Sequence, residues 1–465
     1  MLSDKAGIIP RLRLRSASTS QPVAPLNEPQ QHTTLRPSAC PGLLRIVQAL
    51  DGGICRIKLN GGAISAAQAL AVANAAERFA GGVIEATNRG NLQIRGIGGE
   101  SRGLIDSLLA AGLGPRSAAG DDVRNLMLSP TAGIDPHGVL DTRPLAARIL
   151  VSLEDNPLFH DLSAKFAVQL DGGEALAMLE HPHDLWLSAV ERDGEGWLAF
   201  GLAGCPTDTP LAAVRVEDGH ALVVAVLELF LERARPEQTR MRHLLAECSV
   251  AALLQAMAER VALHPIERWQ RAPAEVNRHI GTHAQHEAGQ VHVGAVPPLG
   301  RLNASMLEGA AHLSEAFGDA SLRLTPWQSL LLPNIRAEDA AILSQQLQDL
   351  GFVLDAAQPL AHLLACTGSA GCAKGLADTK HDAVQLAALL QRPGTERHVH
   401  LSGCPRSCAS AHTAPVTLLA VGAGQYDLYF RDARQPGFGA LHARNLTIDA
   451  VGALLDARSR SPLDA

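Results

Sequence analysis

Apolar and polar positions recur in the same order in two distant stretches of the chain, residues 63–97 and 301–335. In each stretch, apolar residues first recur at helical spacing and then form two short strand-like runs separated by a polar turn. Recurrence of one pattern at a distance indicates an internal duplication. Aligned without a gap, the two stretches match at Ile64 and Leu302, at Thr87 and Thr325, at Leu92 and Leu330, and at Ile97 and Ile335.

Both copies predict the same local elements. Ser65 with Gln68 makes a capping box, which predicts a helix through about Phe79. The first copy continues with strands at 83–87 and 92–97 around the turn NRGN, and with a helix at 101–113. The second copy predicts a helix after Asn303, strands at 321–325 and 330–333, and a helix at 338–351. Each unit is therefore β-α-β-β-α, a ferredoxin-like layer with its helices on one face.

The duplication predicts two half-molecules related by a pseudo-twofold axis, with a natural ligand site between them. Between the copies we expect strands at 147–153, 165–170 and 196–203 and then a helix-rich end at 220–262. The predicted organisation is a disordered tail (1–38), a first ferredoxin-like unit (39–113), a first α/β unit (114–262), a linker (263–293), a second ferredoxin-like unit (294–355) and a second α/β unit (356–465).

Composition excludes several classes of partner. The chain has 40 Lys and Arg against 47 Asp and Glu, a net charge of −7, so it lacks the basic footprint of a nucleic-acid-binding protein. No apolar run approaches the roughly 18 residues that span a bilayer, and the start lacks the apolar segment of a signal peptide. We therefore expect a cytoplasmic protein that binds neither nucleic acid nor membrane.

Four of the eight cysteines cluster near the end of the chain, as Cys366-x5-Cys372 and Cys404-x3-Cys408. The segment between them predicts a helix that starts at the capping pair Thr379 and Asp382, and then a short strand at 399–401 that leads into the loop SGCPRSC. Two cysteine-bearing loops that flank one helix can bring four thiolates together. The other four cysteines (Cys40, Cys55, Cys205 and Cys248) are expected to be small buried apolar residues.

Four thiolates suit either Zn²⁺ or a [4Fe–4S] cluster. Structural zinc favours tighter spacings than these, whereas a cluster is wider than one ion, and Gly368, Gly371 and Gly403 let backbone amides approach its sulfides. The spacing therefore favours the cluster. A mononuclear non-haem iron is a weaker second candidate, because its histidines would stand in a Gly/Ala/Pro-rich linker that supports ligands poorly (His279, His283, His286 and His292).

The cysteine spacing in its SGCPxxC setting, together with the repeat, resembles the sulfite and nitrite reductase family over roughly residues 38–460. The resemblance implies an α+β fold of two ferredoxin-like units and two larger α/β units. In that family the cysteine equivalent to Cys408 bridges the cluster to sirohaem. The resemblance also implies that Arg89, Arg124 and Lys165 bind the carboxylates of a tetrapyrrole, with Asn91, Gln93 and Arg95 as further candidates from the same hairpin.

Two features separate this chain from the reductases. Ala167 stands where they carry a second lysine, and residues 36–62 resemble the precorrin-3B synthases, which are cobalamin-pathway members of the family. That resemblance implies a monooxygenase in which O₂ hydroxylates C-20 of precorrin-3A and the ring A acetate closes a γ-lactone. Its reductant would be an electron-donor protein or NAD(P)H-linked. A sirohaem-dependent sulfite or nitrite reductase and a non-catalytic, cluster-bearing tetrapyrrole-binding relative remain the alternatives.

Overall fold

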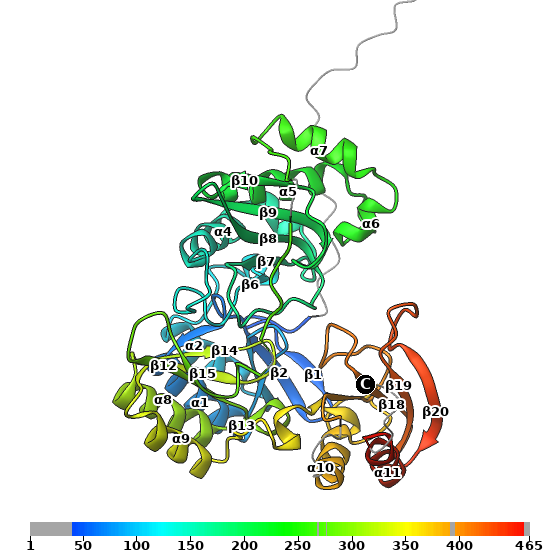
Figure 1. The fold of residues 1–465 in the computed structure, drawn as a ribbon. Coiled ribbons are helices and arrows are strands. Elements are labelled where there is room, and N and C mark those ends of the chain that lie inside the picture. The colour runs from blue at the N-terminus through cyan, green and yellow to red at the C-terminus, as the bar shows by residue number, and fades with distance from the viewer. Residues whose placement is uncertain (1–39, 267–268, 276, 391–395, 460–465) are drawn as a thin grey trace, which may run out of the picture. The chain divides into compact units, whose positions relative to one another are not determined.

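The computed structural model describes residues 40–459 except 267–268, 276 and 391–395. The predicted tail (1–38) and the end of the chain therefore lie outside the described residues. Within them, the chain forms four five-stranded sheets (Figure 1). Two of these sheets belong to the predicted ferredoxin-like units, and the other two carry the α/β segments.

The two ferredoxin-like sheets exchange a strand. The first has the order β1-β2-β5-β4-β13 and the second β11-β12-β15-β14-β3, so that β13 and β3 each complete the sheet of the other copy. The strands are β1 (Val47–Ala49), β2 (Gly52–Ile57), β3 (Ala63–Ser65), β4 (Val83–Ala86), β5 (Leu92–Ile97), β11 (Gly281–Ala284), β12 (Gln290–Ala295), β13 (Arg301–Asn303), β14 (Ser321–Leu324) and β15 (Leu330–Arg336).

Strand register confirms the pseudo-twofold relation between the copies. Arg301 of β13 stands opposite Glu85 of β4, and Ala63 of β3 stands opposite Arg323 of β14. In the gapless alignment Ala63 corresponds to Arg301 and Glu85 to Arg323, so the two exchanges are the same contact made twice. The connection between the two sheets is therefore reciprocal, as in a symmetric dimer.

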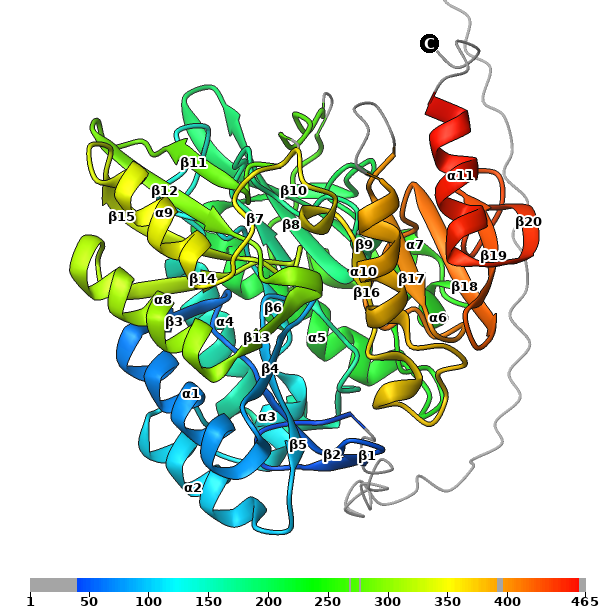
Figure 2. The ribbon, with the colours of Figure 1, turned by 90° about the horizontal axis from the view of Figure 1, so that it is seen from below.

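Helices cover one face of these two sheets, as predicted (Figure 2). Helix α1 (Ala66–Ala80) begins at the predicted capping box of Ser65 and Gln68, and α8 (Ala304–Phe317) begins at Asn303, whose side chain accepts from the Met306 N–H. Helices α1 and α8 pack on each other, and α2 (Ser101–Ala110) and α9 (Ala340–Asp349) flank them. Apolar residues from both copies form a single buried core beneath these helices.

The other two sheets share one connectivity. Each has two parallel pairings followed by two antiparallel ones, in the orders β6-β7-β8-β9-β10 and β16-β17-β18-β19-β20. The strands are β6 (Leu126–Met127), β7 (Val168–Asp171), β8 (His183–Arg192), β9 (Glu195–Gly204), β10 (Ala212–Arg215), β16 (Leu364–Ala365), β17 (Val399–Ser402), β18 (Val416–Gly422), β19 (Gln425–Phe430) and β20 (Ala440–Leu446). Their helices are α3 (Ala118–Val123), α4 (Arg143–Asp155), α5 (Gly219–Arg233), α6 (Met241–Leu245), α7 (Val250–Ala258), α10 (Thr379–Leu389) and α11 (Ile448–Ser459).

Three local predictions were wrong. Residues 147–153 lie in helix α4 rather than a strand, because Leu145, Ile149 and Leu153 are buried at helical spacing. The predicted linker (263–293) contributes β11 and the start of β12 to a sheet. Helix α10 is capped by Asp378, one residue before the predicted start. In the described part of the chain, no helix is both long and apolar enough to cross a membrane.

Candidate functional site

The cysteine-bearing loops meet at one edge of the last sheet. Strands β16 and β17 are parallel neighbours, so their carboxyl ends lie side by side, and Cys366 follows the first while Cys404 and Cys408 follow the second. The Gly403 N–H donates to Cys366 Sγ over 3.2 Å, which joins the two loops directly. Cys372 follows one turn later, where its N–H donates to the Gly368 carbonyl over 2.9 Å.

All four of these cysteines are free thiols and lie near one another. Burial raises the pKa of the Cys408 thiol, and the negative charges of Cys366, Cys404 and Cys372 raise it further. Thiolates so arranged repel one another unless positive charge is placed among them, which is what a bound metal group supplies. No group of three or more His, Cys, Asp or Glu among the described residues is placed to bind a single metal ion. Four thiols on two adjacent loops are the donor set that a [4Fe–4S] cluster uses.

Glycines allow the first cysteine loop to fold tightly on itself. Gly368 has a φ of +66°, and a Cβ there would lie 2.5 Å from the Ala377 carbonyl oxygen. A Cβ on Gly375 would lie 2.5 Å from the Gly368 carbonyl carbon. Side chains at these two positions would force this loop open. The approach of backbone amides to the sulfides of a cluster, predicted from Gly368, Gly371 and Gly403, stays a prediction.

The first ferredoxin-like sheet turns a polar face toward the cysteine segment. On β2, Cys55 and Ile57 are buried in the core, so Arg56 points to the opposite face. Register places Arg56, Gln93, Glu85 and Arg301 in one row across four strands. This polar row faces another part of the protein rather than water, because Glu85 contacts Thr367 and the charge of Cys408 acts on Arg56.

A cationic site lies beside Cys408. Burial, and after it the charges of Arg240 and Arg56, lower the pKa of Arg89 to about 10. Arg240 is neutralised by Asp184, whose two carboxylate oxygens each accept from its Nε over 2.9 Å. The Arg89 guanidinium has no hydrogen-bond acceptor among the residues that the structure describes. Arg56 and Arg89 therefore form a half-buried positive charge suited to an anionic ligand.

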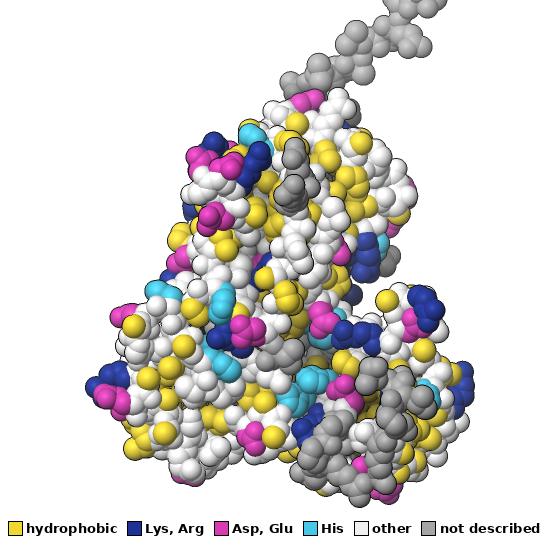
Figure 3. Space-filling view, in the orientation of Figure 1, with side chains coloured by type: hydrophobic (Ala, Val, Ile, Leu, Met, Phe, Trp, Pro, Cys, Tyr) yellow, Lys and Arg dark blue, Asp and Glu magenta, His cyan; other side chains and the backbone are white. Residues whose placement is uncertain are grey.

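Neutral histidines adjoin these arginines. The His181 ring lies against that of His412, with centroids 5.0 Å apart, and His183 Nδ1 donates to the His181 carbonyl over 2.8 Å. Burial and the charge of Arg89 lower the pKa of His183 to about 3, so it is neutral near pH 7. Within the described residues, Nδ1 of His181 and Nδ1 of His412 are buried without a hydrogen-bond partner. His181 and His183 are buried, so the histidine side chains that Figure 3 shows on one face of the molecule, beside charged groups of both signs, are other ones.

The structure places the three other predicted substrate ligands differently. Asn91 Oδ1 accepts a hydrogen bond from the Leu59 N–H over 2.8 Å, so the oxygen of this side-chain amide stabilises the hairpin. Arg124 is buried and paired with Asp121 (3.3 Å) and Glu154 (3.4 Å). These contacts favour a structural role for Arg124.

Lys165 and Ala167 were expected to lie on the same face of a strand, but they do not. Lys165 is exposed in the turn that precedes β7, whereas Ala167 is buried and bonded through its N–H to Asp184 Oδ2 (2.9 Å). The alternation that was predicted for a strand does not apply in this turn. Of the predicted cations, the structure brings only Arg89 together with Arg56 and Cys408.

The equivalent place in the second copy holds an aromatic stack. Trp327 aligns with Arg89, and its ring stacks on His279 with centroids 5.0 Å apart and planes 12° apart. His283 and His292 use a ring nitrogen to donate to the backbone carbonyls of Ile280 and Arg278. The histidines of this region therefore support the fold, and the candidate mononuclear iron site is not formed by the described residues.

The buried histidines predict a loss of stability in acid. Burial lowers the pKa of His183 and His279 to about 3 and that of His292 to about 4. The unfolded chain then binds more protons than the folded chain below about pH 6.5, so the free energy of unfolding falls as pH drops from there toward 4. Each histidine contributes up to roughly 1.4 kcal/mol per pH unit. Urea unfolding at several pH values measures the slope, and His279→Phe should reduce it; an equal slope in that variant would contradict this origin.

Comparison with known proteins assigns the family. A model described as the nitrite/sulfite reductase ferredoxin-like half domain matches residues 47–112 and 283–350, one match for each copy of the repeat. A model described as the nitrite and sulphite reductase 4Fe-4S domain matches residues 119–264. The chain is 31% identical to the chloroplastic ferredoxin–nitrite reductase of Zea mays over 391 residues, which cover 78% of this chain and 68% of the maize protein. The chain belongs to the nitrite and sulphite reductase family.

Within this family, two further relatives bear on function and fold. A precorrin-3B synthase of Sinorhizobium sp is 29% identical over 405 residues, which cover 84% of this chain and 82% of that protein. The solved structure of the Mycobacterium tuberculosis NirA protein superposes with a TM-score of 0.71 at 23% identity, covering 89% of this chain and 82% of that one. The family fold is therefore shared along most of the chain.

The 4Fe-4S domain match does not include the four clustered cysteines. It covers the sheet β6 to β10, whereas the four clustered cysteines lie in the sheet of equal connectivity that follows residue 356. Sequence reasoning missed Arg56, Glu85 and Lys380, which complete the surroundings of these cysteines. Alternation on β2 and β4 places Arg56 and Glu85 off the core face, and this was the available signal.

Proposed function

We propose that this chain is a precorrin-3B synthase-like monooxygenase of cobalamin biosynthesis that converts precorrin-3A to precorrin-3B. The observation that carries the proposal is the half-buried cationic site of Arg56 and Arg89 beside Cys408, in a chain that has Ala167 where reductases have a lysine. The similarity to a precorrin-3B synthase along 82% of that protein's length supports the same reaction.

Cys366, Cys372, Cys404 and Cys408 would hold a [4Fe–4S] cluster in this proposal, and the cluster supplies one-electron transfer. Arg56 and Arg89 bind carboxylates of the tetrapyrrole, because a polyanion offsets their half-buried charge. Neutral His181 and His183 supply hydrogen bonds to the ring or its acid groups without adding charge. One oxygen atom of O₂ enters at C-20 and the other leaves as water, with two electrons from an external reductant.

A sirohaem-dependent nitrite or sulfite reductase is the second candidate, favoured by the 31% identity to the maize enzyme. The loss of one cationic side chain at Ala167 weighs against it, because reduction of a small anion needs cations that bind it and deliver protons. A non-catalytic tetrapyrrole-binding relative is the third. The three differ in what is bound on purification and in what happens to precorrin-3A.

The test is turnover of precorrin-3A by anaerobically purified, iron-loaded protein after addition of O₂ and a reductant. We expect a product that has gained one oxygen atom, carries label from ¹⁸O₂ and forms only with O₂ present. Strong sirohaem absorption in the purified protein, with nitrite or sulfite reduction, would replace this proposal by the reductase. Tight binding of precorrin-3A without any change in its mass would favour the non-catalytic relative.

A further inference from the structure

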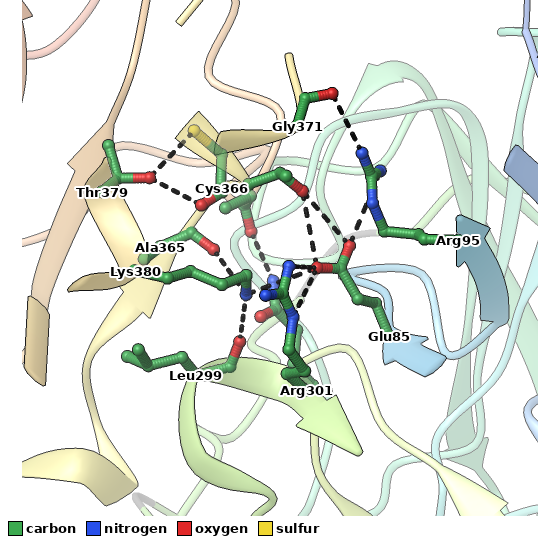
Figure 4. A network of polar contacts seen from close by, with 12 residues as sticks. Glu85, Arg95, Leu299, Arg301, Ala365, Cys366, Gly371, Thr379 and Lys380 are labelled. Atoms are coloured by element: carbon green, nitrogen blue, oxygen red, sulfur yellow. Dashed lines mark hydrogen bonds and ion pairs between the residues drawn. The ribbon is translucent and has the colours of Figure 1, made fainter. Parts of the chain in front are cut away.

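Glu85 is the meeting point of three cations from segments far apart in the chain, of which Arg95 and Lys380 are largely shielded from water (Figure 4). Its carboxylate lies 2.6 Å from Arg301 Nη2, 3.7 Å from Lys380 Nζ and 3.9 Å from Arg95 Nη1. Arg301 belongs to the exchanged strand β13 and Lys380 to helix α10, which follows the first cysteine loop. Arg95 also pairs with Asp51, whose two carboxylate oxygens accept from Arg95 Nε and Nη2 over 2.9 Å each.

Lys380 lies directly beneath the first cysteine loop. Its Nζ donates to the carbonyls of Leu299 (2.7 Å) and Ala365 (3.3 Å), and Ala365 immediately precedes Cys366. The neighbouring Thr379 hydroxyl donates to the Cys366 carbonyl over 2.6 Å and lies 3.6 Å from Cys366 Sγ. Figure 4 shows the Lys380 side chain pointing toward Glu85, with Cys366 close to it.

Both members of the pair are shielded from water. The side chains of Lys380 and Glu85 are 12% and 13% exposed. Burial lowers the pKa of Lys380, and the charge of Glu85 opposes that lowering. Burial alone would raise the pKa of Glu85, yet Lys380, Arg95 and Arg301 together lower it, so the carboxylate stays ionised. In a buried setting a unit charge acts over longer distances than at the surface, because water screens it less.

We propose that Lys380 and Glu85 set the reduction potential of the iron–sulfur group bound at Cys366, with Lys380 raising the potential and Glu85 lowering it. Adding an electron increases the negative charge of such a group, so a nearby cation stabilises the reduced form and a nearby anion destabilises it. This inference rests on the proposed [4Fe–4S] ligation but not on the identity of the tetrapyrrole substrate. Lys380 and Glu85 act as positioning residues, since neither touches the sulfur atoms directly.

Two neutralising variants should shift the potential in opposite directions. In an EPR-monitored redox titration of the reconstituted full chain, Lys380→Met should disfavour reduction at least tenfold, which for one electron is about 59 mV more negative. Glu85→Gln should shift the equilibrium the other way, and Lys380→Arg should retain the native value. Lys374→Met is the matched control, because Lys374 is also close to a cysteine in the chain but is exposed to water; its shift should be smaller than threefold.

Iron and sulfide contents are measured first, and each potential is taken from the loaded fraction. Shifts of the same sign for Lys380→Met and Glu85→Gln would overturn the proposal, as would shifts no larger than that of Lys374→Met. Failure of every buried variant to hold iron would mean that the network only supports the loop, which also overturns it. Absence of precorrin-3A turnover would contradict the proposed function while leaving these potentials interpretable.

Discussion

Cys366→Ser is expected to reduce bound iron from about four atoms per chain to near zero after reconstitution. The thiolate is the ligand, and a serine hydroxyl does not ionise near neutral pH to replace it. Cys366 also accepts the Gly403 N–H, so its loss removes the contact that joins the two cysteine loops. Iron and acid-labile sulfide analysis measures the effect, together with the cluster absorption near 400 nm expected roughly for such a centre.

Cys205→Ser is the control for this prediction. Cys205 is a free thiol outside the cluster, and its N–H is held by Asp208 Oδ2 over 2.8 Å whatever the side chain is. We expect this variant to load iron as the native chain does. Full iron and sulfide loading of Cys366→Ser, or equal loss in both variants, would contradict the assignment of Cys366 as a ligand.

Arg89→Met is expected to weaken binding of a metal-free octacarboxylate tetrapyrrole, with uroporphyrin as the stable probe, by roughly 10- to 100-fold. A hydrogen bond to a charged group contributes about 1.5–3 kcal/mol, and among the described residues the guanidinium has no acceptor of its own to lose. The variant should remain folded, because removal from water disfavours the half-buried charge of Arg89 more than the attraction of Asp184 and Cys40 favours it. Absorbance titration gives the Kd, and urea unfolding reports stability.

Arg124→Met should instead lower the free energy of unfolding and leave the affinity for the tetrapyrrole close to native. Breaking its pairs with Asp121 and Glu154 removes the guanidinium from two carboxylates, of which Asp121 keeps, among the described residues, only the Leu43 N–H as hydrogen-bond donor, and costs about 3–5 kcal/mol of unfolding free energy. Where the variant remains folded, its affinity for uroporphyrin should be close to native. If instead Arg124→Met lost affinity without losing stability, Arg124 would be the ligand that the family resemblance implies. An unchanged Kd in Arg89→Met would contradict the cationic site.

Local signals predicted the repeated units well and the connecting segments poorly. Capping residues such as Ser65 and Asn303 determine where a helix starts within a few residues, so the sequence carries that information directly. In contrast, residues 147–153 are apolar on nearly every position, and such a run fits a buried strand as well as a buried helix. The strands β11 and β12 were not fully predicted, because histidines and glycines interrupt the alternation of apolar and polar residues in them.

The candidate site was also predicted well where the signal is local in the sequence and poorly where it depends on contacts between distant residues. The spacing from Cys366 to Cys408 predicted the cysteine cluster, and the structure brings these thiols together. The roles of Glu85 and Lys380 depend on a strand register and a helix position that join residues almost 300 apart. Conversely, Arg124 matches a family segment, yet its side chain is already neutralised by carboxylates that no pattern along the chain connects to it. Partners in space decide whether a cation is available to a ligand.

The exchange of β3 and β13 has a consequence for how the chain matures during synthesis. Ile64 of β3 pairs opposite Leu322 of β14, so neither sheet is complete until the ribosome has made both copies. At about 5–20 residues per second, that delay is on the order of 10–50 s. Throughout this interval the edge of β4 lacks its neighbour, and an unpaired strand edge can capture other chains. Correct assembly in the cell therefore depends on the late pairing of β13 with β4. A chaperone that covers β4 would protect this edge until then.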